Sequence, residues 1–387
     1  MPEPRRACIT GIGAVSPFGR DAGALWAALT AGRSALAPVT SFDPDGLACR
    51  IAGEVRGYGP REDIDPAAAA AMDRRALFAA DAAIQALVQS GLPMTAESTA
   101  AVGVAVGCEL PDAAPVSTAA QVARTVGAGG PVSQLQNAAP AGLMAIGEAA
   151  EWVRREDCAI AVAGGAETPV SARWFEHFGR AGMLTQRDDD PARAVRPYDL
   201  ARDGFALSEG AAMLVLEDEE LAARRGAAVL GYVEGYGATF NRAPVAHPAA
   251  NPVDAARAMQ AALMKWDVTL QGEIDVIFGT AGGGALDAIE GQAIARVWGP
   301  NRDRLWVTAI KGALGHTLGA SGALAAVAAL YCLQSGLIPP TLNLDQQDPR
   351  CGGLEVVAGD VRRLHGTKAM VNAFGLGANA SLILARP

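Results

Sequence analysis

The sequence has few charged residues and few aromatic residues, and it contains only four histidines. Charged residues make up 19% of the chain and aromatic residues 5%, and the formal net charge is −9. No basic tract is present, which argues against a nucleic-acid partner. No uninterrupted apolar run reaches the ~18 residues of a membrane-spanning helix, and the amino terminus has no signal-peptide pattern. We therefore expect a cytoplasmic protein that binds neither nucleic acid nor membrane.

The six cysteines lack the spacing of a metal site or a redox pair. None forms a CxxC pair, and no histidine cluster accompanies them. Reduced, mostly buried thiols are the simpler interpretation. A nucleotide-binding interpretation of Gly11-Ile-Gly13 also fails, because no third glycine or downstream ribose-binding acid stands in register. We expect no metal and no cofactor.

What the chain does contain is an alternation of short apolar runs with alanine-rich stretches, and half of its residues are hydrophobic. Continuous apolar runs of this kind are typical of strands buried on both faces. The predicted strands are 101–107, 159–163, 212–216 and 274–278. The predicted helices are 73–89, 143–155, 252–265, 288–298 and 320–335. The alternation predicts a layered α/β architecture.

A faint internal repeat accompanies this alternation. The sequence of the strand and turn at 9–19 is similar to that of residues 229–238. The strand at 102–107 is similar to residues 276–284. Two similar halves are therefore plausible, dividing near Arg225 into residues 1–225 and 226–387. No Ser-rich or low-complexity linker separates them.

Five motifs along the chain carry a resemblance to a known family. They are residues 8–19 (CITGIGAVSPFG), 161–167 (AVAGGAE), 196–210 (RPYDLARDGFALSEG), 311–322 (KGALGHTLGASG) and 372–379 (NAFGLGAN). In this order they resemble the β-ketoacyl synthases of fatty-acid and polyketide assembly. The resemblance implies the thiolase fold, in which two related halves pack as five α-β-α-β-α layers.

The resemblance also shows what is missing from the reaction centre. Active members hold the growing acyl chain on a cysteine thiolate at a helix start, where the helix dipole lowers the thiol pKa. Ala139 stands at that position, and a methyl group cannot form a thioester, so the chain alone cannot perform ordinary condensation. Pro140 and Gly142 nevertheless suit a helix start that packs closely.

Of the family's two histidines, only one is retained. Counting back from Asp287 places Gly279 at the first histidine position, and glycine has no donor for the enolate oxygen. His316 and Lys311 match the active pattern. One imidazole without its partners cannot run the reaction, so a structural His316 is the simpler interpretation. Hydrogen bonding to the loop and contact with a carrier-linked thioester stay open as alternatives.

Further positions are implied by the resemblance. Leu376 replaces the aromatic side chain that gates the acyl pocket, so Leu376 and His316 are the candidate substrate contacts. Glu209, Asp203 and Asn379 are expected to be structural. The segment between residues 107 and 134 is shorter than in a typical member, where it lies near the dimer interface and the floor of the acyl tunnel. A changed floor implies a changed limit on chain length.

The whole pattern most resembles the chain length factor, or ketosynthase β subunit, of a type II polyketide synthase. Such a subunit pairs with a catalytic ketosynthase α subunit and shapes the acyl tunnel, and acyl carrier protein meets the complex. Aromatic-polyketide members usually have glutamine at the nucleophile position and no Gly-His-Thr, so Ala139 and His316 favour a divergent, polyene-forming system. Two alternatives remain: a malonyl-carrier-protein decarboxylase, which Gly279 disfavours, and a stand-alone acyl-binding homodimer.

Overall fold

A computed structural model of the chain describes residues 5–93, 95–242, 251–264 and 272–387. Its strands form a central sheet made of two parts with the same strand order. The first part contains β1 (Ala7–Val15), β4 (Val102–Gly107), β5 (Val132–Leu135), β6 (Ile160–Glu167) and β7 (Gly210–Asp218). The second contains β8 (Gly231–Phe240), β9 (Ile274–Phe278), β10 (Trp306–Thr308), β14 (Lys368–Phe374) and β15 (Ala378–Ala385), with β12 (Glu355–Val356) outside β10.

The order of strands repeats from one part to the other. The first part runs β5-β4-β6-β7-β1 and the second β10-β9-β14-β15-β8. In each part the last strand of the chain, β7 or β15, runs antiparallel to both of its neighbours, and the other neighbouring strands of the part are parallel to each other. A short antiparallel contact between β1 and β8 joins the two parts. The repeat noticed in the sequence therefore pairs equivalent strands, β1 with β8 and β4 with β9.

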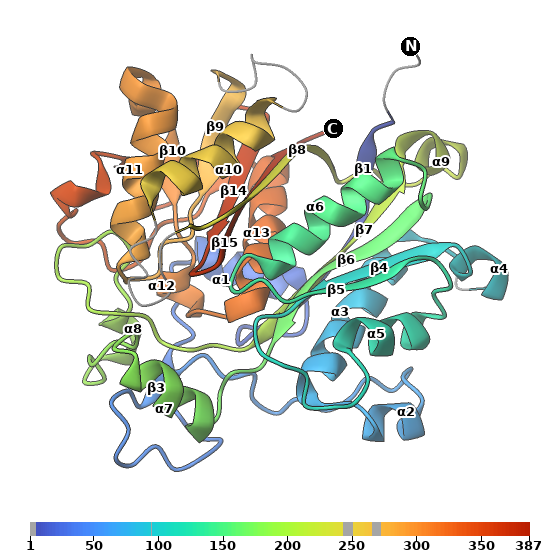
Figure 1. The fold of residues 1–387 in the computed structure, drawn as a ribbon, viewed down its shortest axis with the longest axis horizontal. Helices are drawn as coiled ribbons and strands as arrows, with labels where there is room; N and C mark the ends of the chain where they lie inside the picture. Colours follow the sequence, from blue (N-terminus) through green and yellow to red (C-terminus); the bar gives the residue numbers. More distant parts are fainter. Residues whose placement is uncertain (1–4, 94, 243–250, 265–271) are drawn as a thin grey trace.

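Six helices cover the faces of the two sheet parts in three layers. They are α3 (Arg74–Ser90), α5 (Thr118–Val126), α6 (Ala141–Arg154), α10 (Pro252–Met264), α11 (Leu286–Trp298) and α13 (Ser321–Ser335). Figure 1 shows α6 and α13 in the middle, with α3 and α5 beyond one sheet part and α10 and α11 beyond the other. The five-layer thiolase-like fold is thus confirmed.

Shorter elements connect these layers. They are α1 (Ala22–Thr30), β2 (Ala37–Pro38), β3 (Ile51–Ala52), α2 (Pro66–Ala70), α4 (Ala96–Thr99), α7 (Ala172–Arg180), α8 (Pro191–Ala194), α9 (Glu219–Arg224), η2 (Gly299–Arg304), α12 (Lys311–Leu314), η3 (Leu318–Ala320), β11 (Leu337–Ile338), η4 (Pro349–Cys351) and β13 (Arg362–Arg363). The predicted division near Arg225 falls between α9 and β8, and it stays a prediction.

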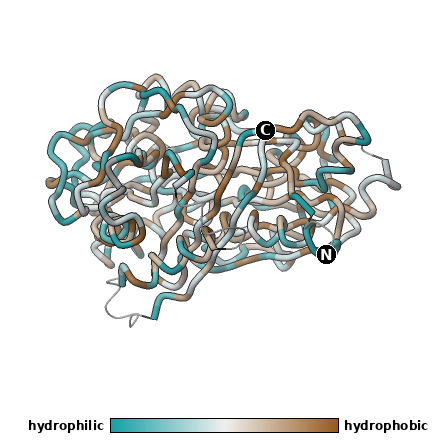
Figure 2. The backbone as a smooth tube through the Cα atoms, turned by 90° about the horizontal axis from the view of Figure 1, so that it is seen from above, coloured by the Kyte–Doolittle hydropathy of each residue, from teal (hydrophilic) through white to brown (hydrophobic). Residues whose placement is uncertain are grey.

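The two middle helices, α6 and α13, contain few polar residues because a sheet part covers each of their two sides. The stretch Leu318–Ser335 is apolar and long enough to cross a membrane, yet 83% of it is buried inside the protein, as in a core helix. Hydrophilic segments lie mainly along the outline of the molecule (Figure 2). All six cysteines are buried and unpaired, which confirms their interpretation as free core thiols.

The predicted elements are found, with shifts at their ends. The helix predicted at 143–155 begins earlier, at Ala141. The strand predicted at 159–163 continues to Glu167, because Gly164 and Gly165 pair with β7 instead of turning away. The end of the helix predicted at 252–265 lies outside the described residues.

A degenerate candidate active site

A small cavity lies between the start of α6 and the loops of the second sheet part. Its lining includes Ala139 before α6, Gly279 after β9, and Lys311 at the start of α12. The cavity has a volume of about 10 Å³, which is about the room that one water molecule needs. Of the described residues, neither His316 nor Leu376 belongs to the lining. The fold therefore brings together the two positions that the sequence predicts to be degenerate and the lysine that it predicts to be retained.

The Ala139 side keeps the geometry of a strained turn before a helix. Ala138 has a φ of +56°, which is uncommon for a residue with a side chain. The helix starts one residue after Pro140, which has a φ of −71° and gives no side-chain cap. A Cβ on Gly142 would lie 2.5 Å from the carbonyl oxygen of Gly319, so glycine lets the helix start pack closely against this loop. The backbone that would present a nucleophile is in place.

The Gly279 side is organised by two buried carboxylates. Asp287 accepts hydrogen bonds from the backbone N–H groups of four residues at 2.9–3.2 Å; they are Tyr198, Gly282, Gly283 and Gly284. Glu290 accepts from Thr280 N at 2.9 Å and from Ala281 N at 3.0 Å. The loop after β9 is thus held by acceptors on α11.

Lys311 is buried against the same loop. Its Nζ donates to the carbonyl oxygen of Thr280 at 2.7 Å. Burial lowers the pKa of Lys311 to about 8, although the nearby carboxylates of Glu290, Asp287 and Glu109 act in the opposite direction. The lysine therefore titrates close to neutral pH and supplies a positive charge at one wall of the cavity.

His316 is fixed as a neutral imidazole. Its Nδ1 accepts a hydrogen bond from Leu318 N at 3.1 Å and lies 2.9 Å from the hydroxyl of Ser321. Because Nδ1 serves as an acceptor, the proton is assigned to Nε2. Burial, and then the charge of Lys311, lowers the pKa of His316 well below its ordinary value. The ring also packs edge-on against Phe205, with 4.7 Å between ring centroids.

The turn that carries Leu376 lies beside the helix start but outside the cavity. It connects β14 to β15, and Gly375 N donates to Ala378 O at 2.9 Å. A Cβ on Gly375 would lie 2.9 Å from Cδ of Pro140, which places the turn against the Ala139 side. Leu376 itself is 40% exposed. Asn379 is buried in β15, and its Nδ2 lies 3.5 Å from the Thr239 hydroxyl.

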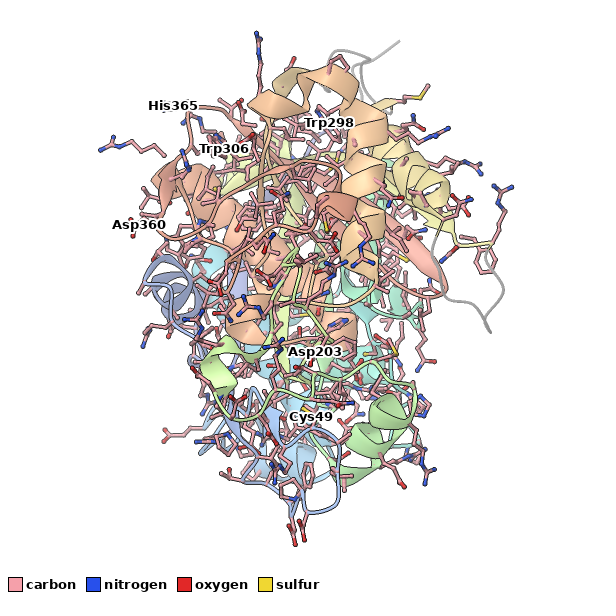
Figure 3. The ribbon with its side chains drawn as sticks, turned by 90° about the vertical axis from the view of Figure 1, so that its left-hand side faces the viewer. Cys49, Asp203, Trp298, Trp306, Asp360 and His365 are labelled. Atoms are coloured by element: carbon pink, nitrogen blue, oxygen red, sulfur yellow. The ribbon has the colours of Figure 1, made fainter. Side chains whose placement is uncertain are left out.

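Glu209 and Asp203 both contact loops. Glu209 accepts from Val55 N at 2.8 Å and pairs with Arg74 at 2.7 Å. Asp203 accepts from the Thr185 hydroxyl at 2.7 Å. Figure 3 shows Asp203 well away from the end of the molecule that carries Trp298 and His365.

Sequence reasoning missed Glu109, which follows β4 in the shortened segment. One of its carboxylate oxygens is buried and has no hydrogen-bond partner among the described residues. Burial, and then the charge of Glu167, raises the pKa of Glu109 to about 8, while Lys311 opposes this shift. No sequence signal marks this residue, since its surroundings come from several distant segments.

A buried ionic network anchors the same segment. Arg75 on α3 pairs with Glu167 at 3.0 Å and with Asp112. Glu167 in turn accepts the backbone N–H groups of residues 109 and 110, and Asp112 accepts from the Gln134 side chain at 2.6 Å. The loop that follows β4 is therefore tied to α3, β6 and β5. Among the described residues, no group of three or more His, Cys, Asp or Glu could hold a metal ion.

Comparison with known proteins identifies the family. Residues 5–117 and 110–222 match the model of the β-ketoacyl synthase N-terminal domain, and residues 230–345 match that of the C-terminal domain. The chain belongs to the β-ketoacyl synthase family.

Individual members of the β-ketoacyl synthase family match over nearly the whole chain. A 3-oxoacyl-[acyl-carrier-protein] synthase 2 of Synechocystis sp. is 32% identical, covering 97% of this chain and 96% of that protein. The actinorhodin polyketide putative beta-ketoacyl synthase 1 of Streptomyces coelicolor is 34% identical, covering 90% and 81%. Among solved structures, the ishigamide ketosynthase/chain length factor has a TM-score of 0.88 and 31% identity, covering 99% and 100%. The relatives include both 3-oxoacyl-[acyl-carrier-protein] synthases and polyketide beta-ketoacyl synthases, so the role must be argued from the residues of the site.

Proposed function

We propose that this chain is the non-catalytic chain length factor, or ketosynthase β subunit, of a type II polyketide synthase. The observation that carries the proposal is the cavity between Ala139 and Gly279. It lacks a cysteine thiol at residue 139 and a donor at residue 279, and at about 10 Å³ it has no room for an acyl thioester. The likeness to the ishigamide ketosynthase/chain length factor supports the proposal.

In this role the chain pairs with a catalytic ketosynthase α subunit in the cytoplasm. Strand β5 lies at the end of the sheet and has β4 as its single neighbour among the described strands, so one row of its backbone groups is unpaired. Val132 on this strand is 46% exposed, and the exposed residues Gln136 and Asn137 lead from it to Ala139. A partner on this edge would lie next to the site, and an obligate interface buries on the order of 2,000 Å² or more.

The shortened segment after β4 is then a candidate for the floor of the shared acyl tunnel. It is anchored through Arg75 and Asp112 and has Ala113 exposed in the isolated chain. Acyl carrier protein would bring the growing acyl chain to the complex. Ala139 together with His316 favours a polyene-forming, reducing system. Ala113→Trp should then shorten the product, while Ala113→Ser should leave product length unchanged.

The deciding experiment is native mass spectrometry of the tagged chain purified from its own host. We expect a one-to-one complex with a ketosynthase that has the active-site cysteine. A homodimer with no such partner would overturn the proposal.

The second candidate is a malonyl-carrier-protein decarboxylase, which the neutral His316 and the buried Lys311 favour and Gly279 opposes. Carbon dioxide release from malonyl carrier protein by the purified chain, abolished by His316→Ala, would support it. If neither a partner nor this activity is found, the acyl-binding homodimer becomes the leading hypothesis.

A further inference from the structure

The cavity is smaller than its missing side chains would suggest. A methyl group stands in place of the thiol at residue 139, and a hydrogen atom in place of the imidazole at residue 279. Removing buried side chains leaves a cavity unless neighbouring groups move into the space. Only about 10 Å³ remains here. Some other group must therefore fill the volume beside Gly279.

That group is the hydroxyl of Tyr198. A Cβ built on Gly279 meets the Tyr198 Oη well inside contact distance, and lies 2.9 Å from Oε2 of Glu290. Tyr198 is 0% exposed, and its Oη donates a hydrogen bond to Glu290 Oε2 at 2.7 Å. No side chain fits at residue 279 while this hydroxyl is in place.

Tyr198 is held at both its backbone and its hydroxyl, so its side chain cannot easily move away from Gly279. Its N–H donates to Asp287 at 2.9 Å, and its carbonyl oxygen accepts from Asp348 N at 2.9 Å. The residue has a φ of +61°, a conformation that is unfavourable for a side chain of this size. Glu290, which accepts the hydroxyl, is itself fixed by Thr280, Ala281 and the Asn372 side chain.

We propose that Tyr198 and Glu290 form a plug that occupies the space of the first catalytic histidine. In the presence of this plug, Gly279 is required for packing. The loss of the histidine is therefore built into the surroundings of residue 279, and replacing Gly279 alone cannot reverse it. The inference deepens the proposed non-catalytic role, but its physical content, a steric coupling between residues 198 and 279, does not depend on what the chain does.

A double-mutant cycle on the full chain tests the coupling. Gly279→Ala is expected to lower the Tm by about 5 °C, because the added methyl overpacks the site. Tyr198→Phe removes the atom that the methyl meets and, of the nearest atoms, leaves the Glu290 carboxylate at 2.9 and 3.3 Å. The loss caused by Gly279→Ala should therefore be at least halved in the Tyr198→Phe background.

Gly284→Ala is the matched control, since it lies in the same loop and a Cβ there meets no atom within 4 Å. Its effect on Tm should be the same with and without Tyr198→Phe. Equal losses of Tm for Gly279→Ala and Gly284→Ala would overturn the proposal. So would a loss of Tm for Gly279→Ala that is undiminished in the Tyr198→Phe background.

A larger substitution gives a second measurement if the thermal shifts are small. Gly279→His should yield folded chain only together with Tyr198→Phe, whereas Gly284→His should fold in either background. Folded Gly279→His with Tyr198 intact would contradict the proposal. These measurements read stability alone, so their failure is distinct from failure to find a ketosynthase partner in the mass spectrum.

Discussion

The Ala139 and Gly279 sides of the cavity, which we predict to be degenerate, differ in what surrounds each residue. On the Ala139 side, the strained turn at Ala138 and the closely packed helix start remain, and only the reactive atom is absent. On the Gly279 side, the Tyr198 hydroxyl has taken the space of the missing side chain. The first change is local to one residue. The second change is shared with other residues, so it should resist reversal by one substitution.

The two sides also differ in how their backbone is held. The Ala139 side depends on close approach, since Gly142 packs against Gly319 without room for a Cβ. The Gly279 side depends on the acceptors Asp287 and Glu290, which satisfy the N–H groups of its loop. Buried backbone donors are costly to leave unpaired. Removing an acceptor should therefore destabilise the loop on the Gly279 side and leave the helix start on the Ala139 side folded.

Asp287→Ala should have the largest effect. It removes the acceptor of four backbone N–H groups, and leaving buried donors unpaired costs about 1–3 kcal/mol each when water cannot replace the acceptor. We expect a loss of about 4 kcal/mol or more in the free energy of unfolding, measured by urea denaturation. Asp43→Ala is the control, because this exposed carboxylate accepts one backbone N–H, that of Asp45. Equal losses would show that the loop is not held by its acceptors.

Glu109→Gln should have an intermediate effect that depends on pH. Folding raises the pKa of Glu109 from 4.5 to about 8, so between these values the folded state binds more protons than the unfolded state. The glutamate therefore lowers stability progressively as pH rises through this window. We expect Glu109→Gln to change the free energy of unfolding little at pH 5 and to increase it by about 2 kcal/mol or more at pH 8.5.

Thermal unfolding at the two pH values checks this prediction, with the exposed Glu62→Gln as the control. A gain that is the same at pH 5 and pH 8.5 would contradict the raised pKa. The measurement tests the first sheet part, because Glu109 lies in the segment that is anchored to β5 and β6.

The sequence was sufficient to predict the fold, since motif order implied the five layers. The structure places Gly279 and Ala139 on one cavity, and their assignment as degenerate catalytic positions stays a prediction. The sequence named Gly279 by counting back from Asp287. It could not predict that Tyr198 fills the space beside Gly279, because that depends on how two distant segments pack. The sequence could not predict the unpartnered carboxylate oxygen of Glu109 for the same reason. Exposure of Leu376 also depends on packing, and its role as a substrate contact stays a prediction.

Ala139→Cys should have the smallest effect on stability and gives the sharpest contrast between the two sides. The added sulfur atom lies beside a cavity of about 10 Å³, so we expect a change below about 1 kcal/mol. The new thiol precedes the N-terminus of α6, where the helix dipole favours the thiolate. Burial instead raises the pKa of the native thiols, to about 12 for Cys8 and about 11 for Cys49.

The ultraviolet absorbance of a thiolate should therefore appear at lower pH in the Ala139→Cys variant than in the unmodified chain, as measured by pH titration. Ala145→Cys, buried in the middle of α6 and away from the helix start, is the control and should ionise only at higher pH. The variant should still show no condensation, because Gly279 offers no donor and Tyr198 occupies the space where one would stand. A measurable condensation rate from Ala139→Cys alone would mean that the Gly279 side is no obstacle to the chemistry. In that case the plug would be a packing feature without consequence for activity, and the two sides would be degenerate in the same sense.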